Sequence, residues 1–147
     1  MPATLSSSSA AFALPVRSVV EARPLWRGLE PPSGTGVSRK TAQRLCDAAM
    51  LATSAAFALP LYELAAPTRR SPDAAFARQS AMYLAHVAFG LSYSEIGRGF
   101  RRDRTTAAYA CRLVEDWRDD PAVDMVLASL ENACGALRHR LAATVRP

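Results

Sequence analysis

Apolar residues recur at helical spacing along most of the chain after residue 37, and no stretch alternates in the manner of a β-strand. The first helix is expected between Ser38 and Pro60 over about five turns, because a serine cap opens it and a proline closes it. Its apolar face is expected at Leu45, Ala48, Ala49, Ala52 and Ala56. A short helical turn containing Leu61, Leu64 and Ala65 is expected next, closed by Pro67.

Two further helices have clear start signals. Ser71-Pro72-Asp73 combines a cap, a first-turn proline and an early acid, and the helix it opens is expected to stop at Gly90. Its core stripe is expected at Ala81, Leu84, Ala85 and Ala88. Asp119-Asp120-Pro121 opens the last helix, whose apolar stripe comprises Val123, Val126, Leu127, Leu130, Ala133, Cys134, Leu137 and Leu141. We expect this stripe to cover the core, and a dimer seam is the alternative.

Between the helix that begins after Ser71 and the last helix, residues 92–118 contain two helix starts close together. Ser92 followed by Glu95 forms a capping box, the arginine pair at 101–102 interrupts the short helix, and Asp103 is expected to cap a second helix with its carboxylate. This second helix is expected from Arg104 to about Arg118, with a buried stripe at Ala107, Ala110, Cys111 and Val114. The arrangement predicts a helix-turn-helix, although a helical hairpin in an all-α core fits the same spacing.

The predicted fold class is therefore all-α, a helical bundle containing a helix-turn-helix. Residues 1–37 are rich in serine, proline and glycine without sustained periodicity, and we expect a disordered tail there. Residues 38–147 are expected to form one helical domain. The uncharged run from Ala48 to Tyr62 is about fifteen residues and contains Pro60, whereas a membrane span needs roughly twenty, so no membrane helix is expected.

The chain carries a net charge of +5, which favours an anionic partner. Its three cysteines form no CxxC pair, and we expect Cys46, Cys111 and Cys134 to be reduced core residues of a cytoplasmic protein. With two histidines, no metal-ligand spacing is present. No nucleophile with a base, carboxylate pair or cofactor loop can be picked out, so we expect a protein that is not an enzyme and needs no cofactor.

From about Ala52 to Leu137, the sequence resembles the C-terminal DNA-binding domain of the bacterial replication initiator DnaA, a helix-turn-helix fold related to that of the Trp repressor. The matching pieces are the 57–64 turn, Arg69-Arg70, Arg78-Gln79-x-Ala81-Met82-x-Leu84-Ala85, Leu91-Ser92-x-x-Glu95-Ile96-Gly97, Phe100, Asp103-x-Thr105-Thr106 and Ala110-Cys111-Arg112. Their order and spacing agree over some eighty residues. The signal is much more specific than a helix-turn-helix pattern alone.

The resemblance implies a role for each matching residue. An arginine that enters the minor groove would be Arg70 or its neighbour Arg69. The base-contacting positions in the major groove would be Asp103, Arg104 and Thr105. Contacts to backbone phosphates would come from Arg78, Gln79, Ser94 and Thr106. Beside these positions, Arg98, Arg101, Arg102 and Arg104 form a basic cluster opposed only by Asp103, where the DNA would lie.

Three positions depart from the family's pattern. Arg101 stands where the family's turn usually has glycine, so it must take a strained positive φ or alter the turn. Arg104 replaces the family's histidine, and a guanidinium favours a guanine edge. Ser94 replaces a frequent proline. These changes predict a DNA site different from the initiator's usual box.

No G-x-x-x-x-G-K-[ST] motif occurs, so the ATPase part of the initiator is not expected in this chain. We expect a sequence-specific binder of double-stranded DNA that uses no ATP, is associated with the nucleoid, and acts as a monomer or weak dimer. Its role would be transcriptional regulation or modulation of replication initiation. The alternative is a helical protein-interaction module that has lost DNA binding.

Overall fold

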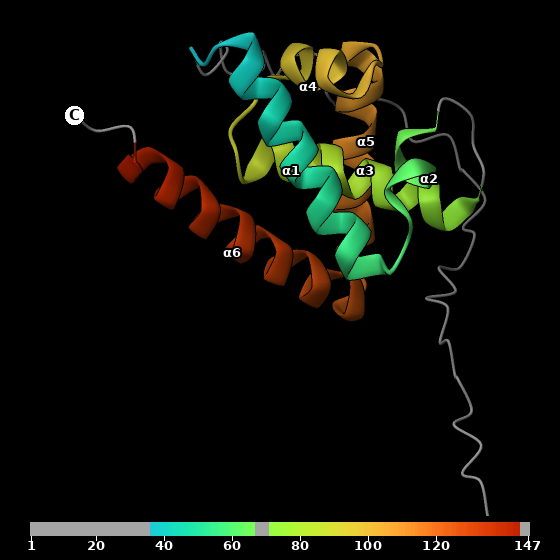
Figure 1. Ribbon diagram of the computed structural model, residues 1–147. Coiled ribbons are helices and arrows are strands. Elements are labelled where there is room, and N and C mark those ends of the chain that lie inside the picture. Colours follow the sequence, from blue (N-terminus) through green and yellow to red (C-terminus); the bar gives the residue numbers. More distant parts are fainter. Residues whose placement is uncertain (1–35, 67–70, 145–147) are drawn as a thin grey trace, which may run out of the picture.

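The computed structural model describes residues 36–66 and 71–144, with side chains as far as Arg140. This part of the chain contains six α-helices and no strand (Figure 1). They are α1 (Arg39–Phe57), α2 (Leu61–Ala65), α3 (Pro72–Val87), α4 (Tyr93–Phe100), α5 (Arg104–Trp117) and α6 (Pro121–Thr144). The all-α class with a helix-turn-helix is confirmed, whereas the predicted tail lies outside the described residues apart from its last two positions.

Three serine caps form as the sequence predicts. The hydroxyls of Ser38, Ser71 and Ser92 each accept a hydrogen bond from the backbone N–H three residues later. Ser92 is part of a complete capping box, because the Glu95 Oε2 also accepts from the Ser92 N–H at 2.7 Å. Each cap satisfies an N–H that the helix itself leaves without a partner.

The cap predicted for Asp103 is wrong in one respect. Asp103 occupies the N-cap position of α5, but its side chain makes no cap hydrogen bond within the described structure. The carboxylate is exposed and its benefit to α5 is limited to the attraction between its charge and the positive end of the helix.

Helix α3 is the centre of the fold and contacts each of the other five helices described. Its predicted core residues Ala81, Leu84, Ala85 and Ala88 are all buried. Its buried surface extends well beyond that stripe, to Phe76, Ala77, Met82 and Tyr83, because helices pack around it on several sides. The helix ends at Val87, slightly before the predicted stop, and Gly90 takes a φ of +71° in the connection to α4.

The apolar face of α1 is rotated from the predicted one. The buried positions are Ala42, Cys46, Ala49 and Thr53, and Ala56 is exposed. Thr53 is polar and was not predicted to be buried. Its hydroxyl donates to the carbonyls of Ala49 and Met50, at 3.0 Å each, so it is buried without an unsatisfied donor.

The stripe on α6 is buried over part of its length. Val123, Leu127, Leu130 and Cys134 are buried, which confirms that this helix covers the core. Ala133 and Leu137 are exposed, so the prediction was wrong for them. Ala133 lies between the buried Leu130 and Cys134 and is turned away from the core, whereas Leu137 belongs to the C-terminal part of α6, which extends past the helices it covers (Figure 1). Leu141 is outside the residues whose side chains are described.

The three cysteines are buried free thiols, as predicted. Burial raises the pKa of Cys46 and of Cys111 to about 12, with smaller contributions from nearby carboxylates. Within the described residues, no helix is long and apolar enough to cross a membrane.

Candidate nucleic-acid interface

The turn between α4 and α5 is a tight left-handed connection. Arg101 has a φ of +55°, which confirms the strained positive φ expected where a glycine would be usual. This conformation costs a non-glycine residue about 1 kcal/mol. The Arg102 N–H donates to the Gly97 carbonyl at 2.8 Å, so the chain turns back at once and α5 starts beside the end of α4.

Two glycines of α4 allow close packing, Gly97 against the start of α5 and Gly99 against α1. A Cβ at Gly97 would lie 2.7 Å from the Arg102 carbonyl oxygen and 3.1 Å from the Arg104 nitrogen. At Gly99, a Cβ would lie 2.4 Å from the Cys46 Sγ on α1. Gly97 belongs to the family pattern, but neither steric reason was predicted, because each depends on a neighbour that only the folded chain brings into contact.

Helix α5 presents different residues to the core and to solvent. Its predicted stripe of Ala107, Ala110, Cys111 and Val114 is buried. The polar and charged residues at the start of the helix are all exposed, namely Asp103, Arg104, Thr105 and Thr106. The structure shows no ion pair between Asp103 and Arg104, although they are neighbours in sequence and both side chains are described. Short polar and charged side chains are thus available in the first turn of α5.

A hollow lies between α3 and α5, and we call it the α3–α5 hollow. It is lined by Ala75, Arg78, Gln79, Met82, Arg102, Thr106, Tyr109 and Ala110. Four of these, Arg78, Gln79, Arg102 and Thr106, are residues for which the sequence predicted DNA contact. They come from α3, from the turn and from α5, so the fold gathers into one place residues that are well separated in sequence.

Two arginines of this hollow also hold α2. The Arg78 side chain is buried, and it donates from Nε to the Leu64 carbonyl at 2.7 Å and from Nη2 to the Glu63 carbonyl at 3.3 Å. Arg102 donates from Nη2 to the Ala66 carbonyl at 3.1 Å. These bonds satisfy carbonyls at the C-terminal end of α2, where a helix leaves its last carbonyls without hydrogen-bond partners inside the helix. Both arginines were predicted to contact DNA, and this structural role was not predicted.

The remaining predicted residues are placed differently. Ser94 is exposed on α4, away from the residues that line the α3–α5 hollow. Arg69 and Arg70 lie outside the described residues. Tyr109 was not predicted, yet it is 43% exposed and lines the hollow three residues after Thr106. The signal that could have found it is this helical spacing, which places both side chains on one face of α5.

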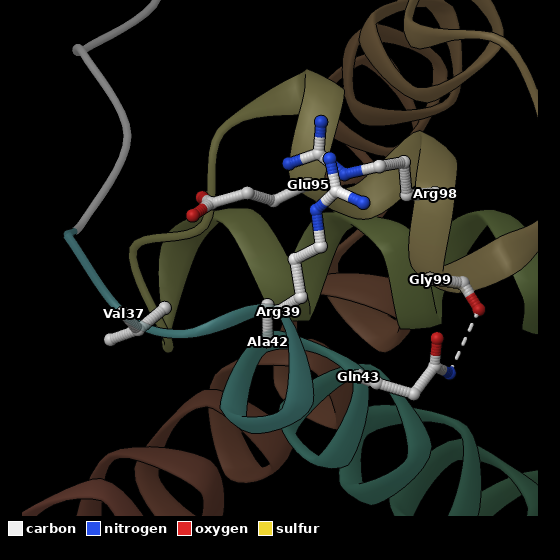
Figure 2. A pocket seen from close by; sticks show the side chains of 7 residues that line it. All are labelled: Val37, Arg39, Ala42, Gln43, Glu95, Arg98 and Gly99. Atoms are coloured by element: carbon white, nitrogen blue, oxygen red, sulfur yellow. Dashed lines mark hydrogen bonds between the residues drawn. The ribbon is translucent and has the colours of Figure 1, made fainter.

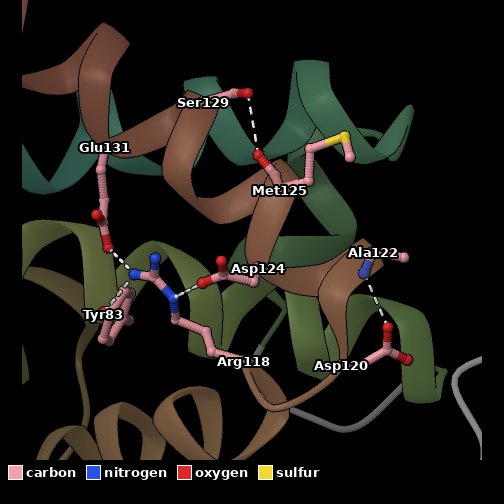
Figure 3. Close-up of polar contacts among 8 residues, drawn as sticks. All are labelled: Tyr83, Arg118, Asp120, Ala122, Asp124, Met125, Ser129 and Glu131. Atoms are coloured by element: carbon pink, nitrogen blue, oxygen red, sulfur yellow. Dashed lines mark hydrogen bonds and ion pairs between the residues drawn. The ribbon is translucent and has the colours of Figure 1, made fainter.

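The opposite end of α5 contains a cluster of satisfied polar groups (Figure 3). Arg118 donates from Nε to the Asp124 Oδ1 at 2.6 Å and from Nη1 to the Tyr83 hydroxyl at 2.8 Å, and it forms an ion pair with Glu131. These partners come from α6 and α3, so Arg118 joins three helices. Among the residues described, no group of acidic, histidine and cysteine side chains could hold a metal ion.

Residues 47–114 match the family described as the bacterial dnaA protein helix-turn-helix. The matched segment runs from the middle of α1 to the last turn of α5, and it contains the α3–α5 hollow. No curated protein matches the chain.

Proposed function

We propose that this chain binds double-stranded DNA at specific sequences, because its residues 47–114 match the bacterial dnaA protein helix-turn-helix family. It does so without ATP, as a monomer or weak dimer. By occupying such sites it regulates transcription or modulates the initiation of replication.

The observation that carries the proposal is the α3–α5 hollow. Gln79 and Thr106 face it from different helices, with Arg78 and Arg102 beside them. Hydroxyl, amide and guanidinium groups are the usual donors to phosphate oxygens. A phosphate in this hollow would lie against the start of α5 and fix the helix for insertion into the major groove. Ser94, on the outer side of α4, supplies a further phosphate contact.

Bases are contacted by the exposed first turn of α5. Asp103 and Arg104 have side chains in solvent without a partner in the described structure, and Thr105 follows them. A guanidinium can donate two hydrogen bonds to guanine O6 and N7, and such a contact is worth about 1–3 kcal/mol of discrimination. The DNA sequence that the protein prefers therefore contains a guanine at the position that Arg104 contacts.

The arginines at 69 and 70 add a minor-groove contact, on the basis of their resemblance to the family. A minor-groove arginine responds to groove width and to A·T content. Replacing both by alanine should weaken binding most at sites with an A·T-rich flank. Equal binding by this variant and the wild type at every site would show that Arg69 and Arg70 do not contact DNA.

The salt dependence of duplex binding tests the proposal as a whole. With about four to six phosphates neutralised, log K should fall against log salt with a slope of roughly −4 to −5. The variant Gln79→Ala with Thr106→Ala should weaken binding to all sequences, whereas the control Asn132→Ala, at an exposed position on α6, should bind as the wild type does.

A flat salt response, or no binding even at low salt, would contradict DNA binding. Either result would favour a helical protein-interaction module that keeps the fold. The two functions are thus separated by measurements on the wild-type chain alone.

A further inference from the structure

A second hollow lies between the N-terminal end of α1 and α4, and we call it the α1–α4 hollow. It is lined by Val37, Arg39, Ala42, Gln43, Glu95, Arg98 and Gly99. Figure 2 shows Arg39 reaching over it from α1 and Arg98 from α4. Two guanidinium groups from different helices therefore border one exposed depression.

The two helices are held together at this point. Gln43 donates from Nε2 to the Gly99 carbonyl at 3.1 Å and to the Asp47 Oδ1 at 3.0 Å (Figure 2 shows the first of these bonds). Gly99 itself packs so closely on Cys46 that a side chain there would overlap the sulfur. The separation between the backbones that carry Arg39 and Arg98 is consequently fixed by the fold.

Among the described residues that line this hollow, positive charge exceeds negative charge. Arg39 and Arg98 form no ion pair with any residue that the structure describes, and Lys40 follows Arg39. One carboxylate, that of Glu95, lines the hollow, but it is buried and accepts from the Ser92 N–H in the capping box. The first turn of α1 contains no acidic residue. Cations at this end of a helix are destabilising, so an external anion would lower the energy of the arrangement.

Helix α4 connects this hollow to the proposed DNA-binding face. Ser94 and Arg98 are exposed, and their spacing of four residues places them on one side of α4. Arg101, in the turn that follows α4, is exposed as well. Ser94 is a proposed phosphate contact, and Arg101 lies in the turn before the base-contacting residues. The exposed positive charge therefore runs from the start of α5 along α4 to the start of α1.

We propose that Arg39, Lys40 and Arg98 bind phosphates of duplex DNA that flanks the segment contacted by the helix-turn-helix. This inference rests on the proposed function. It adds a contact from the first turn of α1, which lies outside the segment 47–114 that matches the family. The expected partner is the regular backbone of a duplex, so this contact adds affinity without base preference.

The test compares a double variant, which carries both Arg39→Gln and Arg98→Gln, with the wild type. Both proteins are tested on two duplexes that share one binding site. The short duplex ends at the site, and the long one carries about ten further base pairs on each side, about one helical turn. The double variant should bind the long duplex about ten- to fiftyfold more weakly at 0.1 M salt, with a salt slope shallower by roughly two units. It should bind the short duplex as the wild type does.

The matched control is Arg44→Gln with Arg140→Gln, which removes the same charge from exposed positions that do not line the hollow. Equal losses for both double variants would mean a general effect of net charge and would overturn the proposal. Unchanged binding of the long duplex by Arg39→Gln with Arg98→Gln would overturn it as well. If the wild type binds neither duplex, the proposed function itself has failed.

Both replaced side chains are exposed, so we expect the double variant to remain folded. The variant Arg39→Lys with Arg98→Lys provides a second check, because it keeps both charges and should retain most of the affinity for the long duplex. A lysine variant as weak as the glutamine variant would contradict a phosphate contact made through charge.

Discussion

The two ends of α5 use arginine in opposite ways. At its C-terminal end, Arg118 is bound to Asp124, Tyr83 and Glu131 and its side chain is only 24% exposed. At its N-terminal end, Arg101 and Arg104 are exposed, and neither has an ion pair in the described structure. One end of the helix is fixed by its own protein, and the other presents charge to solvent.

This difference defines two groups of arginines, those that stabilise the fold and those that are available to a ligand. An arginine whose donors are used by carboxylates and a hydroxyl of the same chain contributes to folding and has little left for a ligand. An exposed arginine without a partner contributes little to folding and is available for DNA. Arg78 and Arg102 lie between these limits, since each lines the α3–α5 hollow and also binds a carbonyl of the α2 end.

The largest expected effect is at the C-terminal end of α5. Arg118→Met should lower the free energy of unfolding by about 2–3 kcal/mol, because it leaves two carboxylates and a tyrosine hydroxyl without their shared donor. Urea unfolding measures this loss. Arg104→Met, the matched change at the other end, should alter stability by less than about 0.5 kcal/mol. Similar losses for the two variants would contradict the distinction between the ends.

The caps of the two helices in the helix-turn-helix give a second comparison. Ser92→Ala should cost about 1–2 kcal/mol, because it removes the hydroxyl that accepts from the Glu95 N–H. Asp103→Ala should cost about 0.5 kcal/mol or less, since it removes only the attraction between a charge and the helix end. Thermal or urea unfolding of both variants tests the difference. A larger loss for Asp103→Ala would mean that its carboxylate caps α5 in solution.

The turn itself should show opposite effects on stability and binding. Arg101→Gly should raise the free energy of unfolding by about 0.5–1 kcal/mol, since glycine adopts the positive φ without strain. The same change removes a positive charge from the proposed DNA-binding face and should make the salt slope shallower by up to about one unit. A variant that is more stable and binds DNA equally well would show that Arg101 makes no phosphate contact.

Local signals in the sequence predicted most of the fold. The serines at 38, 71 and 92 and the buried stripe of α5 were identified correctly, because caps and helical periodicity depend on residues close together in the chain. The buried face of α1 was not predicted correctly, since the burial of Thr53 depends on hydrogen bonds that periodicity does not show.

For the candidate site, the family resemblance supplied the residues and the structure supplied their grouping. Gln79 and Thr106 are distant in sequence, and packing of α3 on α5 brings them to one hollow. The Arg118 cluster was missed because its partners lie on two other helices, α3 and α6, and match no local motif. The basic pair of Arg39 and Arg98 was missed for the same reason.

The central claim is that the free first turn of α5 contacts bases, and Arg104→His tests it most directly. Sites selected from a random duplex library by the wild type should hold a guanine at one position where the variant selects a different base. The salt slopes of the two proteins should be nearly equal. Equal loss of affinity for all sequences, with a slope shallower by about one unit, would instead show that Arg104 binds a phosphate, and the claim would be wrong.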